Sequence, residues 1–345
     1  MSKIKTLSET TYSLDAKVNF LRRRETYPGT SAVEAIETHM SWVFLTDGYV
    51  YKLKKPVRYD FLDFRKLESR YRYCMEEASI NQPLAGDTYL GVIPLRVYRG
   101  ALQLDGEGEA VDWLVKMKRL PEEYMLDVVI KEGTSDRESV LRAARKLVDF
   151  YHTSNSFTFT PSDFRQRLIK RIELNSEELL QKKFALERSQ VLSITTDLIH
   201  FIMHRSDLFD QRIAEERIIE CHGDLRPEHI CLAPQPVIID RVEFDWSLRI
   251  MDVAEELSFL MLECELLGEP SVGRLFLNTY EWKSEDKVPE ELITFYKAKR
   301  AFLRAWLAIH HLLEKKYKKE EPKWRNICET YLQMAVDCCR KLVNR

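Results

Sequence analysis

The sequence predicts an α+β fold in two lobes, a small strand-rich N-terminal lobe over residues 1–118 and a large helical C-terminal lobe over residues 119–345. Strand-like runs concentrate in the first third of the chain. Segments with apolar residues at helical spacing dominate after Pro121. A chain of 345 residues is long enough for two such lobes, and a short connection is expected near Lys118–Pro121.

The first lobe is predicted from one hairpin, one helix and three further strands. Two apolar runs in "WVFLTDGYVYKLKK" are joined through Asp47 and Gly48, a pair that tolerates the positive φ angles of a tight turn. A helix is expected over "FRKLESRYRYCMEEASINQPLAG", ending near Pro83 and Gly86. The remaining strands are expected over "YLGVIPLRVY", "ALQL" and "AVDWLVKMKRL".

The second lobe is predicted to be helical, with two short interruptions. Apolar residues at helical spacing occur in "ESVLRAARKLVDFYHTSNSF", "DFRQRLIKRIELNSEELLQKKF", "SQVLSITTDLIHFIMHRSDLF", "MDVAEELSFLMLECELLG", "ITFYKAKRAFLRAWLAIHHLLEKKY" and "NICETYLQMAVDCCRKLV". Short strands are expected around "RIIECHGDL" and "PVIIDRVEF". These interruptions fall where the most informative motif lies.

Composition excludes several classes of protein. The 53 Lys and Arg nearly balance the 55 Asp and Glu, which argues against a nucleic-acid binder, and runs such as "EKKYKKEEPKWR" are typical of a solvated surface. The N-terminal stretch has no apolar block and no run approaches about 18 apolar residues, so we expect a cytoplasmic protein that binds no membrane. The seven cysteines are scattered and odd in number, which predicts free, buried thiols.

The stretch "HGDLRPEHICL", His222 to Leu232, carries the strongest chemical signal. Asp224 follows an apolar strand and a tight glycine turn, so its carboxylate is expected to project from a loop. Asp240 ends the β-branched strand "PVIID", eleven residues after His229, where a carboxylate can bind Mg²⁺. Phosphoryl transfer needs such a carboxylate to orient the attacking hydroxyl, metal ions to neutralise the phosphates, and a lysine to hold the nucleotide.

With this spacing, "HGDLRPEHI…VIID" resembles the H-G-D-x-x-x-x-N…I-D motif of the aminoglycoside-phosphotransferase-like kinases, a small-molecule branch of the protein-kinase-like fold. The resemblance extends from about residue 20 to about residue 310 and is strongest to a bacterial subgroup that is sometimes fused to a P-loop ATPase. No G-x-x-x-x-G-K-[ST] motif occurs in this sequence. The resemblance implies that ATP binds with Mg²⁺ or Mn²⁺ in a cleft between the lobes, and that its γ-phosphoryl group is transferred to a hydroxyl of a small metabolite.

The resemblance also implies which residues contact the nucleotide. The second hairpin strand is expected to carry the phosphate-binding lysine, for which Lys52 fits best and Lys54 is the second choice, while Lys55 is expected on the surface. Glu77 matches the spacing of the glutamate that pairs with this lysine better than Glu76 does. In the connection between the lobes, Lys118 and Leu120 are the residues expected to contact the nucleotide.

For the catalytic loop, the resemblance makes Asp224 the catalytic base or hydroxyl-orienting group and Asp240 a metal ligand. His222 and Asp252 are expected to brace the loop. His229 stands where the family has a metal-binding asparagine. A neutral imidazole suits Mn²⁺ or Zn²⁺ better than Mg²⁺, so His229 either binds the metal or only hydrogen-bonds within the loop.

Three further family features stay without a defined role. Glu243 and Arg249 match the family, but an ion pair or a helix cap accounts for either of them. The strand pair around "AIETHMSWVF", which would cover the phosphates, has no glycine, although backbone amides near Thr38–Ser41 remain available.

The acceptor is expected to be an anionic small molecule. Lys297, Arg300, Arg304 and His311 recur at helical spacing, and Arg226 lies within the catalytic loop. If this helical face lines the cleft, it suits a phosphorylated or carboxylated acceptor; otherwise it is a solvated basic stripe. An aminoglycoside is disfavoured because a polycation requires an acidic pocket, which the sequence does not reveal.

Two alternative functions stay open at this stage. The chain could be an inactive kinase-like scaffold that binds nucleotide without turnover. It could also be a metal-dependent hydrolase, although this reading leaves the lysine-bearing hairpin without a role; its ligands would be His222, Asp224, His229 and Asp240. The oligomeric state and the choice of ATP or GTP are open as well.

Overall fold

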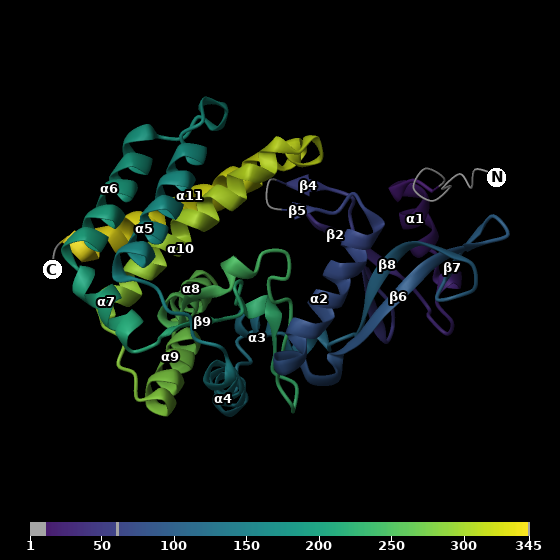
Figure 1. The fold of residues 1–345 in the computed structure, drawn as a ribbon, viewed down its shortest axis with the longest axis horizontal. Helices are drawn as coiled ribbons and strands as arrows, with labels where there is room; N and C mark the ends of the chain where they lie inside the picture. Colours follow the sequence, from purple (N-terminus) through teal and green to yellow (C-terminus); the bar gives the residue numbers. More distant parts are fainter. Residues whose placement is uncertain (1–11, 60–61, 344–345) are drawn as a thin grey trace, which may run out of the picture. The chain divides into compact units, whose positions relative to one another are not determined.

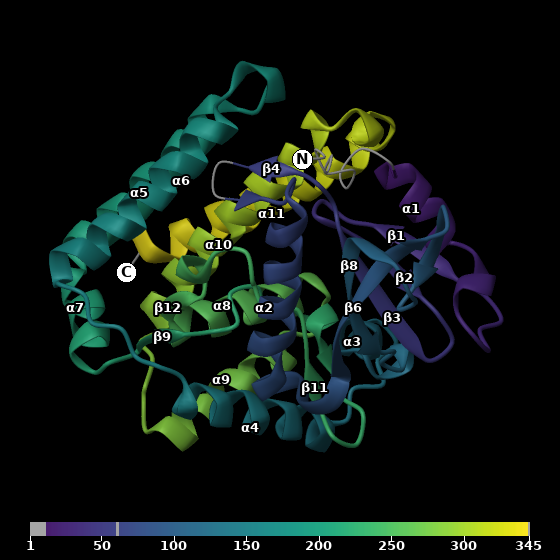
Figure 2. The ribbon, with the colours of Figure 1, turned by 45° about the vertical axis from the view of Figure 1, so that its right-hand side comes forward.

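The computed structural model describes residues 12–59 and 62–343 of the chain (Figures 1 and 2). The chain forms two compact units. The first comprises the chain up to Met125 together with His229–Leu248, and the second comprises Leu126–Glu228 and the chain from Arg249 onward. A lobe boundary between residues 118 and 119 remains a prediction. The first eleven residues, on which part of the expectation of a cytoplasmic protein rests, lie outside the described residues.

The first unit is built on an antiparallel sheet, which confirms the strand-rich part of the predicted α+β fold. Among the described residues, the sheet has the strand order β1-β2-β3-β8-β6-β7. The predicted hairpin is confirmed, because Leu45 pairs with Val50 across the Asp47–Gly48 turn. The strands of this unit are β1 (Glu34–Glu37), β2 (Ser41–Leu45), β3 (Tyr49–Lys54), β4 (Arg58–Tyr59), β5 (Leu62–Asp63), β6 (Tyr89–Tyr98), β7 (Ala101–Leu104), β8 (Glu109–Lys118), β10 (Ile230–Cys231) and β11 (Val237–Ile238).

Helices cover the two faces of this sheet. Helix α1 (Leu14–Leu21) packs its apolar side on a cluster that contains Tyr51 and Leu53 of β3. Helix α2 (Leu67–Ala85) packs against β6 and β8, and its Cys74 belongs to a separate buried cluster with Val115. Because side chains alternate along a strand, Lys52 and Lys54 of β3 point to the opposite side from Tyr51 and Leu53, which is the side of α2.

The end of α2 and its attachment to the sheet follow from particular residues. Gly86 has a φ of 57°, which side-chain-bearing residues rarely adopt, and it ends α2 where the sequence predicts. The buried carboxylate of Asp112 on β8 binds Lys17 of α1 at 2.8 Å and Arg70 of α2 at 2.7 Å. One acidic side chain therefore holds both helices to the sheet.

The second unit is helical, as predicted, with one short strand pair, β9 (Ile218–Glu220) and β12 (Ile250–Asp252). Helix α8 (Val253–Leu266) is buried from Val253 to Cys264 and packs against α9 (Pro270–Ser284) and α10 (Glu290–His310). The other helices of this unit are α3 (Leu126–Lys131), α4 (Arg137–Thr153), α5 (Pro161–Leu179), α6 (Arg188–His204), α7 (Ser206–Ala214) and α11 (Glu321–Val343).

Two composition-based expectations can be compared with the structure. The seven cysteines are all buried and free, as predicted. Within residues 12–59 and 62–343, none of the helices combines the length and the apolar character that crossing a bilayer requires.

Candidate active site

The centre of the site in the first unit is the buried carboxylate of Glu77, which is shared by two lysines. Lys52 and Lys54 project from the same side of β3 toward α2. The Lys52 ammonium lies 2.7 Å from one oxygen of Glu77, and the Lys54 ammonium lies 2.6 Å from the other. Glu77 has no exposed side-chain surface, so its charge depends on these two cations.

Asp240 is the fourth member of this group. Its Oδ1 atom lies 2.6 Å from the Lys52 ammonium, and its side chain is 41% exposed. Asp240 has a φ of 68°, a strained conformation for a residue with a side chain. Its backbone N–H donates to the Tyr89 hydroxyl at 3.1 Å, and the next N–H, of Arg241, donates to the Asn81 side chain at 3.0 Å. These two hydrogen bonds support the Asp240 backbone in this conformation.

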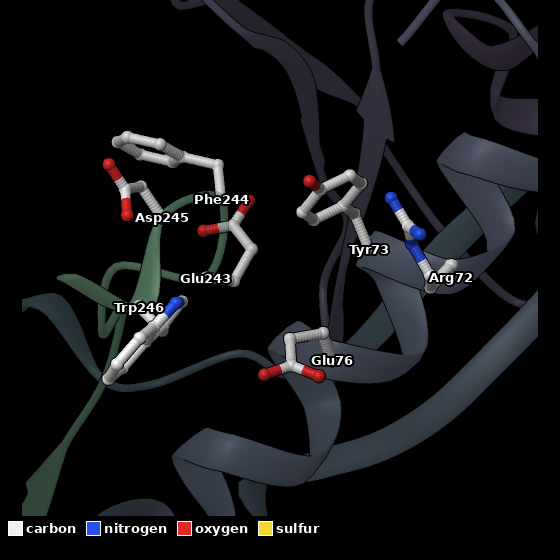
Figure 3. Close-up of a pocket in the computed structure, with 7 residues that line it drawn as sticks. All are labelled: Arg72, Tyr73, Glu76, Glu243, Phe244, Asp245 and Trp246. Carbon is white, nitrogen blue, oxygen red and sulfur yellow. The ribbon is translucent and has the colours of Figure 1, made fainter. Parts of the chain in front are cut away.

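Glu243 forms an ion pair, one of the two simple roles that the sequence left open for it. Its Oε1 atom lies 2.5 Å from the Lys54 ammonium. Glu243 also lines a pocket of about 440 Å³ between α2 and residues 243–246 (Figure 3). The pocket combines carboxylates, one guanidinium and aromatic rings, and it is formed by Arg72, Tyr73, Glu76, Glu243, Phe244, Asp245 and Trp246. The sequence did not reveal these acidic groups as a pocket because they come from segments about 170 residues apart.

The electrostatics of the group keep Lys52 and Glu77 charged. Burial alone would lower the pKa of the Lys52 ammonium, but Asp240 and Glu77 hold that pKa well above its ordinary value. Burial alone would raise the pKa of Glu77, but Lys52 and Lys54 hold it below its ordinary value. Burial raises the pKa of Glu243 despite the neighbouring Lys54. The Lys52–Glu77 pair is therefore ionised at neutral pH.

The residues around Asp240 fit a divalent cation that takes only part of its ligands from the protein. Water or phosphate oxygens would supply the rest. The Oδ2 atom of Asp240 lies 3.7 Å from Nε2 of His229, and the His229 side chain is 8% exposed. In the described part of the chain, no three His, Cys, Asp or Glu side chains form a metal-binding group. Mg²⁺ is commonly bound through one or two carboxylates together with substrate phosphates, and Asp240 suits that mode.

The predicted catalytic loop lies in the second unit up to Glu228. Asp224 has a 34% exposed side chain, and its backbone N–H donates to Nδ1 of His222 at 3.3 Å. His222 is fully buried, a geometry that suits the bracing role predicted for it. Glu256 of α8 accepts the backbone N–H groups of His222 at 3.1 Å and Gly223 at 2.6 Å, as well as the Tyr151 hydroxyl at 2.7 Å.

The bracing contact expected of Asp252 is therefore made by Glu256. Asp252 instead caps α8 by accepting the Ala254 N–H, pairs with Arg212 at 2.9 Å, and accepts the Tyr296 hydroxyl at 3.0 Å. Its position as the residue before a helix explains this arrangement, because an N-cap aspartate binds the N–H groups of its own helix.

Of the cations predicted to bind the acceptor, Arg226 pairs with Asp224, whereas Arg304 lies 3.7 Å from Glu263 of α8 and 3.5 Å from the Tyr331 hydroxyl. Arg226 Nε lies 3.2 Å from Asp224 Oδ2, and Arg226 also pairs with Glu228 at 2.5 Å. Burial would lower the pKa of Arg304, but Tyr331, Glu263 and Asp224 hold it above its ordinary value.

Lys297 and Arg300 are bound elsewhere, so this part of the predicted basic stripe is neither solvated nor open to an acceptor anion. Both are buried and pair with carboxylates of α8, because α10 packs against that helix. Lys297 pairs with Glu265, and Arg300 Nε lies 2.8 Å from Glu255. Arg249 pairs with Glu220 at 2.8 Å, so it forms the ion pair that the sequence left open as one of its two simple roles.

The remaining predicted residues lie along the sheet. Lys118 pairs with Asp87 at 2.5 Å in an exposed position, and Leu120 is half-buried. The expectation that Lys55 lies on the surface is wrong: it is 7% exposed and binds Glu37 at 2.9 Å and the Thr38 carbonyl at 2.8 Å. Since the Ser41 N–H donates to Thr38 Oγ1 at 3.0 Å, the glycine-free turn Thr38–Ser41 is held by its own side chain and by Lys55.

This architecture matches solved small-molecule phosphotransferases over nearly the whole chain. A GDP complex of a mutant aminoglycoside 2'-phosphotransferase-IIIa has a TM-score of 0.53 at 12% identity, covering 93% of this chain and 96% of that one. A thermostable mutant of aminoglycoside phosphotransferase APH(4)-Ia has a TM-score of 0.51 at 10% identity, covering 90% and 96%. A choline kinase from Cryptosporidium parvum has a TM-score of 0.50 at 12% identity, covering 96% and 97%. The chain has the protein-kinase-like fold of the aminoglycoside phosphotransferases, as predicted.

Two uncharacterized bacterial proteins are also similar to this chain in sequence. Uncharacterized proteins from Mycobacterium tuberculosis and Mycobacterium bovis are each 30% identical over 277 residues, which covers 79% of this chain and 54% of theirs. The chain thus spans about half the length of these relatives. No protein-family model matches the chain. The relation to a subgroup fused to a P-loop ATPase stays a prediction.

The two lysines of the site are expected to differ in their effect on stability. Lys54→Met removes a buried ammonium and leaves the largely enclosed Glu243 without its cation, so it should lower the free energy of unfolding by about 3 kcal/mol or more. Lys52→Met leaves Glu77 paired with Lys54 and the exposed Asp240 in water, so it should cost about 1 kcal/mol. Urea unfolding followed by circular dichroism measures both, with the exposed Lys323→Met as control; equal losses for the two lysines would contradict this assignment.

Glu256 is expected to make stability depend on pH. Burial raises the pKa of Glu256, although the N–H groups of Gly223 and His222 and the Tyr151 hydroxyl oppose this. The folded state therefore holds the Glu256 proton to higher pH than the unfolded state, and stability falls as pH rises from the ordinary value of about 4.5 through the raised value. Glu256→Gln lacks this titration. Its unfolding free energy relative to wild type should increase across that pH range, whereas a constant difference would contradict the assignment.

Proposed function

We propose that the protein is an ATP-dependent phosphotransferase that moves the γ-phosphoryl group to a hydroxyl of a small metabolite. The observation that carries this proposal is the arrangement of Lys52, Glu77 and Asp240, in which a lysine on the sheet is held by a buried helix glutamate and reaches an exposed carboxylate. Phosphoryl transfer depends on positioning and on charge stabilisation, and these three groups supply both.

In this proposal, each site residue of the first unit has a defined role. Lys52 binds nucleotide phosphates, with Glu77 orienting its ammonium. Asp240, with His229 beside it, holds the divalent cation, which when bound neutralises charge on the phosphates. Lys118 and Leu120 contact the nucleotide along the end of β8. The rigid Thr38–Ser41 turn replaces a glycine-rich loop over the phosphates.

In the second unit, Asp224 orients the acceptor hydroxyl and accepts its proton. His222 and Glu256 support this role by fixing the backbone of the loop. Arg226 pairs with Asp224, and Arg304 lies close enough for Asp224 to help raise its pKa; we assign both cations to an anionic group of the acceptor, such as a carboxylate or a phosphate. Lys297 and Arg300 have no place in this assignment because they are buried against carboxylates of α8, whereas the Arg304 side chain is 21% exposed and lies farther, at 3.7 Å, from Glu263.

Thermal stability in the presence of ATP tests the proposal. A ligand that binds only the folded state raises its apparent stability, so ATP with Mg²⁺ or Mn²⁺ should raise the melting temperature of wild type. The rise should be lost in Lys52→Ala and Asp240→Ala and kept in the control Lys116→Ala. If ATP produces no rise with either metal, the protein is not an ATP-dependent enzyme.

A further inference from the structure

The ammonium of Lys52 is bound to the carboxylate of Asp240, which a metal ion would need as its ligand. It contacts Asp240 Oδ1 at 2.6 Å and Glu77 Oε1 at 2.7 Å at the same time. Of these two carboxylates, that of Glu77 is fully buried, whereas that of Asp240 is 41% exposed. The lysine therefore stands between the buried anion and the one that water and ions can reach.

Glu77 does not depend on Lys52 alone for its charge balance. Lys54 is only 1% exposed and is held by Glu77 at 2.6 Å and by Glu243 at 2.5 Å. If the Lys52 ammonium leaves, the buried Glu77 carboxylate keeps one cation at hydrogen-bond distance. A lysine that was the sole partner of a buried carboxylate could leave it only at a cost of several kcal/mol.

The backbone of Asp240 is also held independently of Lys52. The hydroxyl of Tyr89 and the amide of Asn81 bind the N–H groups of Asp240 and Arg241. The Lys52 side chain is 16% exposed, in contrast to that of Lys54. The flexible Lys52 side chain is therefore the part of this group that is able to move.

We propose that Lys52 blocks Asp240 from binding a divalent cation until the phosphates of a nucleotide draw the ammonium away, while Lys54 keeps Glu77 and the segment after Asp240 in place. This inference rests on the proposed function. Its physical basis is charge: a divalent cation beside Asp240 is repelled by an ammonium at 2.6 Å from the same carboxylate. Nucleotide phosphates remove the repulsion because they offer Lys52 a new anionic partner.

Binding of Mn²⁺ alone, without nucleotide, tests the inference. The loss of the free Mn²⁺ signal in electron paramagnetic resonance gives the affinity. Lys52→Met removes the repelling charge, so it should bind Mn²⁺ at least about tenfold more tightly than wild type. Lys52→Arg keeps the charge and should bind as weakly as wild type. In the Lys52→Met/Asp240→Asn variant the gain should disappear.

Two controls make the result decisive. Lys54→Met removes a neighbouring positive charge that does not contact Asp240, so it should give no comparable gain. Lys52→Ala is the second variant should the methionine variant fail to fold, and the same gain is expected of it. Affinity for Mn²⁺ that is unchanged in the Lys52 variants, or a gain that persists without Asp240, overturns the inference.

These outcomes are separable from those of the proposed function. The Mn²⁺ comparison contains no nucleotide, so a wild-type protein that fails to bind ATP overturns the proposed function by a different measurement. If ATP raises the stability of wild type but Lys52→Met binds Mn²⁺ no more tightly, only the blocking role of Lys52 is overturned.

Discussion

The buried carboxylate of Glu77 is bound by two lysines, and this arrangement organises the first unit. A fully desolvated anion without partners would destabilise the fold, so β3 and α2 must place Lys52, Lys54 and Glu77 together. Through Lys52 the same carboxylate is connected to Asp240, and through Lys54 to Glu243. The residues assigned to nucleotide and metal are thus held by the interaction that stabilises the unit itself.

The second unit places its catalytic loop by a comparable rule. Helix α8 is buried along most of its length and yet carries acidic residues, each of which must find donors. Glu256 finds them in the backbone of His222 and Gly223, so the buried acid fixes the loop that precedes Asp224. Glu255 finds them in Lys299 and Arg300, which explains why that part of α10 is not open to an acceptor.

The sequence was sufficient for the hairpin, α2 and the long strands β6 and β8, but not for the short strands β4 and β5, because turn residues and periodicity are local properties that need several residues to show. Motif spacing also singled out Glu77, which the structure places on Lys52. Errors arose where a partner distant in sequence decides the outcome. Lys55 is buried because Glu37 and Thr38 bind it, and the loop is braced from Glu256 rather than Asp252. Neither outcome could be predicted without knowing which elements pack together.

The fate of the γ-phosphate tests the account most directly. Phosphorus NMR can follow ATP and Mg²⁺ incubated with the protein and a panel of small hydroxyl compounds that carry a carboxylate or a phosphate. The account predicts that ATP is converted to ADP with a new phosphomonoester signal, and that Asp224→Asn abolishes this signal. Release of inorganic phosphate alone, or ATP that stays intact with every acceptor, would contradict a phosphotransferase that acts on such acceptors.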